Sequence, residues 1–352
     1  MTVARAWAAH AADAPFASFS FERRELEPDD IRIDILYCGV CHSDVHFARG
    51  EWGDPRYPCV PGHEIVGRVS AVGSAVKGFA VGDLAGVGCI VDSCGHCHSC
   101  GEGLEQYCET GLTGTYGGLD PKTGRPTYGG YSDFIVVRES YALHIRHAEA
   151  QLPAVAPLLC AGITVWSPLR HWQAGPGKKV GVVGIGGLGH MAVKYAHALG
   201  AHVVAFTTSP SKADEARRLG ADEVILSREP GSMDAHVRSF DLIVNTVSAG
   251  QDLQALTSLL KRDGTLVLLG AGTEPHVYPQ TFNLLMARRS LAGSIIGGIA
   301  ETQEMLDFSA EHGITSDIEL IGVDGVDRAY DRVVSGDVKY RFVIDLKTLP
   351  AA

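Results

Sequence analysis

The chain has 352 residues, of which 45% are hydrophobic and 20% are charged. This composition is typical of a globular protein with about two domains. A formal net charge of −11 argues against partners such as nucleic acid or an anionic membrane surface, which attract basic patches. We find neither a signal peptide at the start of the chain nor an apolar run of about 20 residues that could cross a bilayer. We therefore expect a cytoplasmic protein without a membrane partner.

Short strands and glycine-rich turns are expected from residue 1 to about residue 150. Residues 31–36 alternate partly between apolar and polar side chains, as strands do, and residues 64–69 follow a Pro-Gly pair. This pattern predicts a β-rich domain over residues 1–152.

The sequence changes to alternating strands and helices after about residue 153. In chain order, the expected elements are strand 179–184, helix 188–199, strand 201–206, helix 212–219, strand 223–226, strand 240–246, helix 253–260 and strand 265–270. Repeated strand–helix–strand units predict an α/β fold, a doubly wound parallel sheet with helices on both faces. We place this domain at residues 153–297.

The last part of the chain, residues 298–352, has a looser pattern. Helices are expected over residues 302–311 and 326–334, and a strand over residues 340–345. We infer that this tail returns to the first domain.

Four cysteines lie within fifteen residues in the spacing C-x2-C-x2-C-x7-C, namely Cys94, Cys97, Cys100 and Cys108. Nine cysteines in a chain of this length do not suggest a disulfide scaffold. Four thiolates at this spacing suit a zinc ion in a closed tetrahedral site. An iron–sulfur cluster is the alternative, because short cysteine spacings also serve clusters.

A glycine motif of the form G-x-G-x-x-G follows the strand expected at residues 179–184 and precedes a helix. In this context the glycines allow a tight turn, a close approach of the backbone to a pyrophosphate, and close packing of helix on strand. A plain glycine-rich turn is the alternative. The motif residues expected to bind a dinucleotide are Gly184, Gly186, Gly187, Leu188 and Gly189.

The region after the next strand indicates which dinucleotide is bound. Folds that bind NAD usually place an Asp or Glu there, which holds the ribose 2′-hydroxyl. This chain has hydroxyls and one ammonium instead, which would bind a 2′-phosphate. The sequence therefore predicts NADP(H), although a turn with a solvated lysine would look the same. The residues concerned are Thr208, Ser209, Ser211 and Lys212.

A second set of metal ligands is scattered along the chain. Cys41, His63 and Cys160 would supply two thiolates and one imidazole, with one position left open. This is the ligand set of a catalytic zinc in alcohol dehydrogenases. The three residues are too far apart in sequence for spacing alone to show that they meet. Cys38, Cys59 and Cys89 remain, and we interpret them as small buried hydrophobic residues.

Several motifs together resemble those of zinc-dependent medium-chain alcohol dehydrogenases, nearest to the cinnamyl alcohol dehydrogenase branch. Besides the four-cysteine segment, they are GVCHSDVH at 39–46, PGHE at 61–64, LLCAGIT at 158–164, GIGGLGH at 184–190 and YRFVID at 340–345. The resemblance covers nearly the whole chain in the order of the family. It implies a GroES-like β-rich catalytic domain, built from the first part and the tail, around a Rossmann domain. It also implies a homodimer.

The resemblance assigns two zinc ions to the chain. Cys41, His63 and Cys160 hold the catalytic zinc, and the four clustered cysteines hold a structural zinc. Asp44 holds the far nitrogen of His63, and Glu64 lies near the metal.

The resemblance also assigns catalytic and cofactor-binding roles. Ser43 passes a proton through the cofactor ribose to His46, an imidazole suited to proton transfer near neutral pH. His42 and Arg341 contact the cofactor phosphates, and Ser294 and Ile295 lie beside the nicotinamide.

The implied reaction is hydride transfer from NADPH to the carbonyl carbon of an aldehyde whose oxygen is polarised by zinc. The cinnamyl branch often carries an aromatic residue where this chain has Ile295, which favours a broader range of aliphatic and aromatic aldehydes. The alternatives are a cinnamyl alcohol dehydrogenase proper and a relative of the zinc-free quinone or enoyl reductases. The joint presence of Cys41, His63 and Cys160 counts against the latter.

Overall fold

The structure is a computed structural model that describes residues 2–53, 55–270, 272 and 274–351. Its contacts divide the chain into two compact units, one of Met1–Cys160 with Gly297–Ala352 and one of Ala161–Ile296. The sequence predicted the two boundaries at 152/153 and 297/298, whereas the contacts place them at 160/161 and 296/297. Cys160 therefore belongs to the same unit as Cys41 and His63.

The first unit is built on a mixed sheet whose strand order is β16-β17-β3-β4-β5-β9, with β8 also paired to β3. Two smaller pairs, β1 with β2 and β6 with β7, stand apart from it. The strands are β1 (Thr2–Ala8), β2 (Ala17–Arg23), β3 (Asp30–Val40), β4 (Ile65–Val72), β5 (Leu84–Val87), β6 (Ile90–Asp92), β7 (Thr113–Gly114), β8 (Phe134–Arg138), β9 (Leu143–His144), β16 (Ile318–Ile321) and β17 (Arg341–Asp345). The helices of this unit are α1 (His42–Ala48), α2 (His98–Gly101), α3 (Leu152–Val155), α9 (Ile299–His312) and α10 (Val326–Ser335).

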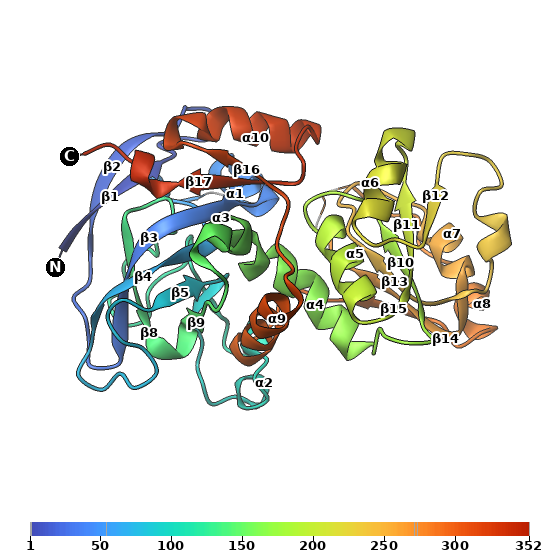
Figure 1. Ribbon diagram of the computed structural model, residues 1–352, viewed down its shortest axis with the longest axis horizontal. Helices are drawn as coiled ribbons and strands as arrows, with labels where there is room; N and C mark the ends of the chain where they lie inside the picture. Colours follow the sequence, from blue (N-terminus) through green and yellow to red (C-terminus); the bar gives the residue numbers. More distant parts are fainter. Residues whose placement is uncertain (1, 54, 271, 273, 352) are drawn as a thin grey trace. The chain divides into compact units, whose positions relative to one another are not determined.

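The C-terminal tail returns to the first unit. β17 pairs antiparallel with β3, so that Phe342 lies opposite Val40 and Ile344 lies opposite Cys38. In Figure 1 the red end of the chain accordingly lies beside the blue β3. These strand residues are buried, since Phe342 and Val343 are at most 1% exposed. The pairing places Arg341 at the start of β17, next to the end of β3 that leads into Cys41.

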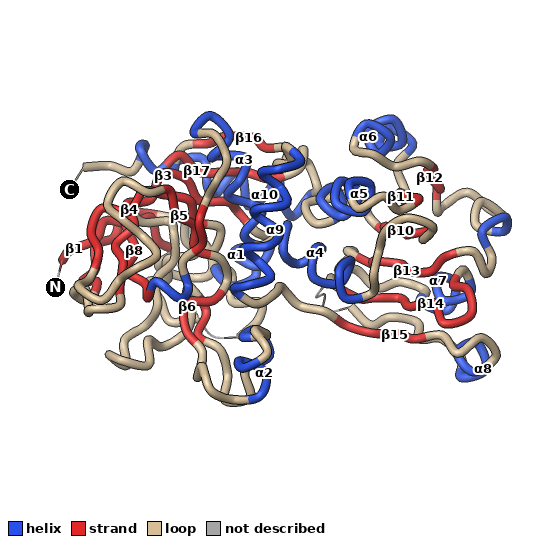
Figure 2. Tube along the Cα trace, turned by 60° about the horizontal axis from the view of Figure 1, so that its bottom comes forward, coloured by secondary structure: helices blue, strands red, loops and turns tan. Residues whose placement is uncertain are grey.

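The second unit is a parallel sheet with the strand order β12-β11-β10-β13-β14-β15. This order, in which the first strand lies at the centre and the chain winds outward in both directions, is that of the dinucleotide-binding Rossmann fold. In Figure 1, α5 and α6 lie on one side of the strands of this sheet and α7 and α8 on the other, and Figure 2 marks the same strands in red. The predicted doubly wound fold is confirmed. The elements are α4 (Ala161–His171), β10 (Lys179–Val183), α5 (Gly189–Ala198), β11 (His202–Thr207), α6 (Ala213–Arg218), β12 (Glu223–Leu226), β13 (Phe240–Asn245), α7 (Leu253–Ser258), β14 (Leu260–Leu268), α8 (Thr281–Leu285) and β15 (Ser290–Gly293).

One predicted boundary in this unit is wrong. The helix expected over residues 253–260 ends at Ser258, and β14 already begins at Leu260. Leu260 is fully buried opposite Phe240 of β13, and this pairing extends the strand backward beyond the run that begins at Thr265. Tertiary pairing thus overrides the local helical pattern.

The turn between β10 and α5 depends on close packing at its last glycine. A Cβ atom on Gly189 would lie 1.8 Å from the carbonyl oxygen of Gly184, a distance that no side chain tolerates. Only glycine therefore lets the helix begin this close to the end of the strand.

Within the described residues, no single helix is both long and apolar enough to span a bilayer, and only one bent pair of segments, 149–159 with 161–171, passes that test by length and composition.

Candidate metal centres and cofactor loop

The scattered ligands meet in the first unit, as the resemblance implied. Cys41 caps α1 directly after β3, His63 and Glu64 precede β4, and Cys160 follows a short turn of helix, η4 (Ala156–Leu159). One ligand atom from each of these four residues lies within 4.8 Å of the others, and all four residues are buried. The sulfur atoms of Cys41 and Cys160 are 3.8 Å apart. Two sulfurs bound at about 2.3 Å to one tetrahedral zinc lie about 3.8 Å apart, so the donor set fits zinc.

The imidazole of His63 is turned so that one nitrogen faces this cluster. Its Nδ1 lies 3.4 Å from Oδ1 of Asp44. Its Nε2 is buried and has no hydrogen-bond partner in the part of the chain that the structure describes. Buried polar atoms are almost always paired, and an unpaired nitrogen beside two thiols is explained by a metal that it would bind.

The carboxylate of Asp44 is completely buried and connects the segments that carry the ligands. It accepts hydrogen bonds from the backbone N–H of Cys41 at 2.8 Å and of Gly62 at 3.1 Å. Gly62 has a φ of +102°, and a Cβ there would lie 2.7 Å from the Cys38 sulfur, so the turn before His63 requires glycine. The predicted role of Asp44, which is to hold Nδ1 of His63, stays a prediction.

Glu64 and Arg341 form a buried ion pair beside the thiols. Burial raises the pKa of the Glu64 carboxyl well above its usual range, and the Arg341 guanidinium opposes this shift. Glu64, Cys41 and Cys160 together raise the pKa of Arg341, which stays charged. The second oxygen of Glu64 has no hydrogen-bond partner among the described residues, so it is available to a metal. The phosphate contact expected of Arg341 stays a prediction.

The predicted relay residues lie on α1. The oxygen of Ser43 is 3.6 Å from the sulfur of Cys41. The rings of His42 and His46 stack with their centroids 4.6 Å apart, and burial beside His46 lowers the pKa of His42. Ser43 thus lies at the metal ligands, while His46 lies one helical turn farther along the same helix.

His46 has two partners that the sequence pattern did not predict. Nδ1 of His46 forms a hydrogen bond with the carboxylate of Glu51, and the ring of Trp52 stacks on His46 at 4.8 Å. The indole is half exposed, so it is not part of the core. Both residues follow α1 directly, so a search for acidic and aromatic neighbours of the relay histidine could have found them.

Cys89 was also misinterpreted. Cys38 and Cys59 are buried as expected, but the Cys89 thiol interacts with Cys160 and His63, which lower its pKa to about 6. It is therefore a third thiol beside the metal cluster. No spacing rule in the sequence indicates this, because Cys89 reaches the cluster only through the fold.

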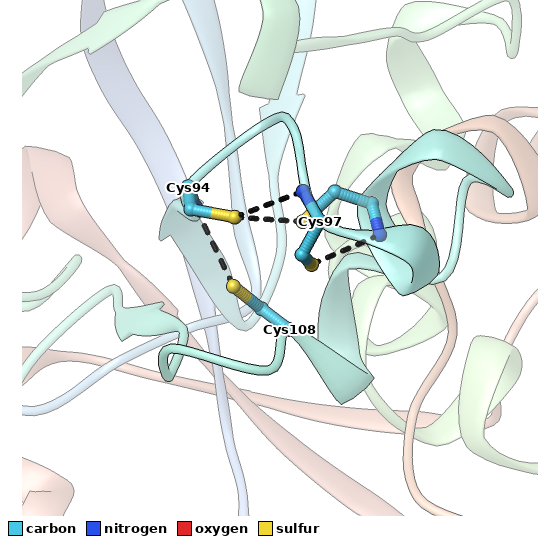
Figure 3. A group of neighbouring side chains, drawn as sticks. Cys94, Cys97 and Cys108 are labelled. Carbon is cyan, nitrogen blue, oxygen red and sulfur yellow. Dashed lines mark hydrogen bonds between the residues drawn. The ribbon is translucent and has the colours of Figure 1, made fainter.

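The four clustered cysteines form a second, closed group. One sulfur from each lies within 4.8 Å of the others, and the sulfurs of Cys94 and Cys100 are 3.9 Å apart. Figure 3 shows the side chains of Cys94 and Cys108 turned toward one another. The backbone N–H of Cys97 donates to the Cys94 sulfur at 3.3 Å, and the N–H groups of His96 and Cys97 lower the Cys94 pKa to about 5. Such N–H groups stabilise thiolates, which are the form that binds zinc.

The glycine loop of the second unit, predicted to hold a pyrophosphate, is open on one side. A Cβ on Gly186 would meet no atom within 4 Å, so this side of the loop is open. Lys212 donates from Nζ to the carbonyl oxygen of Ile185 at 3.1 Å, which places its ammonium over the loop. Ser209 and Ser211 hydrogen-bond to one another at 2.7 Å just after β11. The residues predicted to hold a 2′-phosphate therefore gather beside the loop predicted to hold the pyrophosphate.

A zinc-binding cluster, a closed group of four thiols and a dinucleotide loop in one chain define a zinc oxidoreductase that uses a dinucleotide. The family models agree. Residues 27–147 match the alcohol dehydrogenase GroES-like domain, and residues 187–311 match the zinc-binding dehydrogenase domain. The chain belongs to the zinc-dependent alcohol dehydrogenase family. The predicted combination of a GroES-like domain with a Rossmann domain is confirmed.

Individual relatives match over nearly the full length of the chain. Aldehyde reductase YahK of Escherichia coli is 62% identical over 98% of this chain and 99% of its own. Among solved structures, a cinnamyl alcohol dehydrogenase from Sorghum bicolor has a TM-score of 0.94 and 43% identity, with 100% of both chains covered. The Helicobacter pylori protein of the same type, complexed with NADP(H), has a TM-score of 0.90 and 41% identity, with 98% of this chain and 99% of that chain covered.

The two clusters should respond differently to the loss of one thiol. Cys160→Ala should remove one zinc per chain and abolish turnover, while the protein stays folded and binds NADPH. Cys100→Ala should lower the yield of folded protein and the melting temperature, because a structural zinc stabilises the folded state directly. Metal analysis, thermal unfolding and cofactor fluorescence measure these effects. Two variants that both stay folded and active would contradict the assignment of two zinc sites.

Proposed function

We propose that this chain is an NADPH-dependent zinc alcohol dehydrogenase that works mainly as a reductase of small aldehydes. The observation that carries the proposal is the buried set of Cys41, His63 and Cys160, with Nε2 of His63 unpaired beside two thiols. The set leaves one tetrahedral position for a substrate oxygen or for the free oxygen of Glu64. The name of the Escherichia coli relative, an aldehyde reductase, supports the direction of the reaction.

When bound, zinc would polarise the carbonyl group and NADPH would supply the hydride. The residues of the chain balance the charge of the site and transfer the proton. Arg341 balances the negative charge of Glu64 and the thiolates, and Asp44 keeps a proton on Nδ1 of His63, so that Nε2 carries the free lone pair. Ser43 and His46 deliver the proton that the product alcohol requires, and Glu51 holds the ring of His46 in place.

The substrate range is proposed to be broad. Ile295 replaces the aromatic residue that is often found in the cinnamyl branch, and it is 56% exposed. A smaller side chain beside the nicotinamide would accept aliphatic as well as aromatic aldehydes.

We also place the protein in the cytoplasm, because all nine cysteines are free, which a reducing compartment maintains.

An aldehyde screen tests the reaction. The zinc-loaded protein should oxidise NADPH with short-chain, benzylic and cinnamyl aldehydes, and Cys160→Ala should be inactive with all of them. Loss of NADPH absorbance gives the rates. Turnover of cinnamyl aldehydes alone would favour a cinnamyl alcohol dehydrogenase proper. Reduction of quinones or enones that persists in Cys160→Ala would favour the zinc-free reductase type, and inactivity with every aldehyde would refute the proposal.

Cofactor choice is proposed to depend on the segment after β11. Thr208, Ser209, Ser211 and Lys212 would hold the 2′-phosphate of NADPH, as the NADP(H)-bound Helicobacter pylori relative suggests. The region lacks the carboxylate that would favour NADH.

Removal of the ammonium should change this preference. Lys212→Ala should lower kcat/KM for NADPH by about tenfold to a hundredfold, since a hydrogen bond to a charged group contributes about 1.5–3 kcal/mol. The value for NADH should hardly change, because NADH has no 2′-phosphate. Lys178→Ala, at the amino end of β10, is the matched control and should leave both values unchanged. An equal loss with both cofactors, or a wild-type preference for NADH, would be incompatible with this role.

A homodimer through the second unit is also proposed. β15 is an edge strand of the parallel sheet, and α8 with its C-cap residue exposes three apolar side chains nearby. Phe282, Leu285 and Met286 are 73%, 66% and 74% exposed. An unpaired strand edge beside an apolar surface favours pairing with a second copy.

The dimer is tested by sedimentation. The wild-type chain should sediment at about twice its mass of 37.4 kDa. The double variant with Phe282→Asp and Met286→Asp should sediment as a monomer, because two charges cannot be buried unpaired at an apolar interface. Val334→Asp is the control, because it also replaces an exposed apolar side chain with a charged one, but on α10, and this variant should stay dimeric. A monomeric wild-type protein would rule this interface out.

A further inference from the structure

The first unit contains a cavity that none of the metal ligands lines. It has a volume of about 500 Å³ and lies between the end of β2, the strand β8 and the segment 113–128. This volume is in the range of small-molecule sites. Because neither metal cluster contributes to it, a molecule bound there would not displace an aldehyde from the proposed catalytic zinc.

Arg23, the last residue of β2, is a cationic side chain of this cavity that lacks a carboxylate partner among the described residues. Its Nη2 donates to the carbonyl oxygens of Tyr128 and Gly129 and to the hydroxyl of Ser132, at 2.9–3.1 Å. Its Nε is buried without a hydrogen-bond partner among the described residues, and no carboxylate of these residues forms an ion pair with it. Burial lowers its pKa to about 9, and only the more distant Asp133 opposes the shift. A buried guanidinium held by neutral acceptors is stabilised by an added anion.

A second arginine of the lining, Arg138, differs from Arg23 in having a carboxylate partner. Arg138, at the end of β8, forms an ion pair with Asp92 through Nη2, while its Nε is buried and unpaired within the described residues. Five cationic side chains line the cavity, and all of them except Arg23 form an ion pair with a carboxylate of the described residues. The cavity is therefore matched in charge to a monoanion.

The uncharged part of the lining consists of eight apolar or aromatic residues and four threonines. The rings of Phe21 and Tyr128 are 4.3 Å apart, and the guanidinium of Arg23 lies 4.9 Å from the Phe21 ring centre. Ile135 and Val137 of β8 add aliphatic surface. Such walls favour a flat apolar body over a small hydrated ion.

We propose that this cavity is a second ligand site, which binds a compact monocarboxylate with a flat apolar body through Arg23. The planar fork of the guanidinium suits the two oxygens of a carboxylate, and the Phe21 and Tyr128 rings suit the apolar part. Benzoate is the simplest molecule with this chemistry.

Binding of 4-fluorobenzoate to the zinc-loaded enzyme, followed by fluorine NMR, tests the site. The wild-type protein should bind it saturably, and Arg23→Gln should weaken binding at least tenfold while aldehyde reduction without benzoate is unchanged. Arg23→Lys, which keeps the charge but loses the fork, should fall between the two. Arg32→Gln is the matched control, because Arg32 stacks on Phe134 at 3.9 Å but does not line the cavity, and it should bind like the wild type. If Arg23→Gln does not fold, binding of the probe by Arg23→Lys is compared with binding by Arg32→Gln. Weaker binding by Arg23→Lys supports the proposal, and equal binding contradicts it.

Three results would overturn the proposal. The first is the absence of saturable binding to the wild type. The second is equal binding by the wild type and the Arg23 variants, with competition against aldehyde and loss in Cys160→Ala, which would place the carboxylate at the zinc. The third is displacement of the probe by inorganic phosphate at equal concentration, which would show that charge alone is recognised. Phosphate and benzyl alcohol should each compete poorly, since one lacks the apolar body and the other lacks the charge.

Discussion

The buried carboxylate of Asp44 is the constraint on which the proposed catalytic centre depends. It holds the backbone N–H groups of Cys41 and Gly62 and faces Nδ1 of His63, so it connects two segments that are separated by a loop. A buried carboxylate is costly unless several donors satisfy it, and here the hydroxyl of Tyr131 also donates, at 3.3 Å. Satisfying Asp44 therefore requires the start of α1 and the Pro-Gly turn to lie together. The same arrangement directs the lone pair of His63 into the space between the thiols.

The second constraint is charge balance in a site without solvent. Two thiolates and the carboxylate of Glu64 would bring three negative charges together in a buried space, which only matching positive charge can stabilise. The proposed zinc would supply two positive charges, and Arg341 supplies the third. This explains why a C-terminal arginine is buried beside a catalytic centre made mostly from the first half of the chain. The return of β17 to β3 is therefore part of the site as well as of the fold.

How much could be read from the sequence depended on how local the signal was. The four clustered cysteines and the glycine motif are local, so their spacing limited the first to a zinc ion or an iron–sulfur cluster and, with the flanking strand and helix, indicated a dinucleotide for the second. The β-strand and helix pattern of the second unit was also largely predictable. The exception is the start of β14, which is set by the pairing of Leu260 with Phe240. The set of Cys41, His63 and Cys160 came from the family resemblance, because its members meet only through the folded sheet. Glu51 was missed because it belongs to no motif, although it lies only five residues after His46. Cys89 was missed because it reaches the metal cluster only through the fold.

The closed cysteine group and the proposed catalytic centre are physically connected, although they share no ligand. The segment between Cys100 and Cys108 carries Glu105, whose carboxylate accepts a hydrogen bond from the backbone N–H of Ile299 at 3.0 Å. Ile299 is the first residue of α9, where the chain returns to the first unit. An orphan N–H at a helix start is satisfied in this way, and a carboxylate there also interacts favourably with the helix dipole. The tail that begins at α9 ends in β17, which carries Arg341 to Glu64. A zinc that fixes the cysteine loop therefore also fixes the point from which the tail returns to complete the charge balance of the other site.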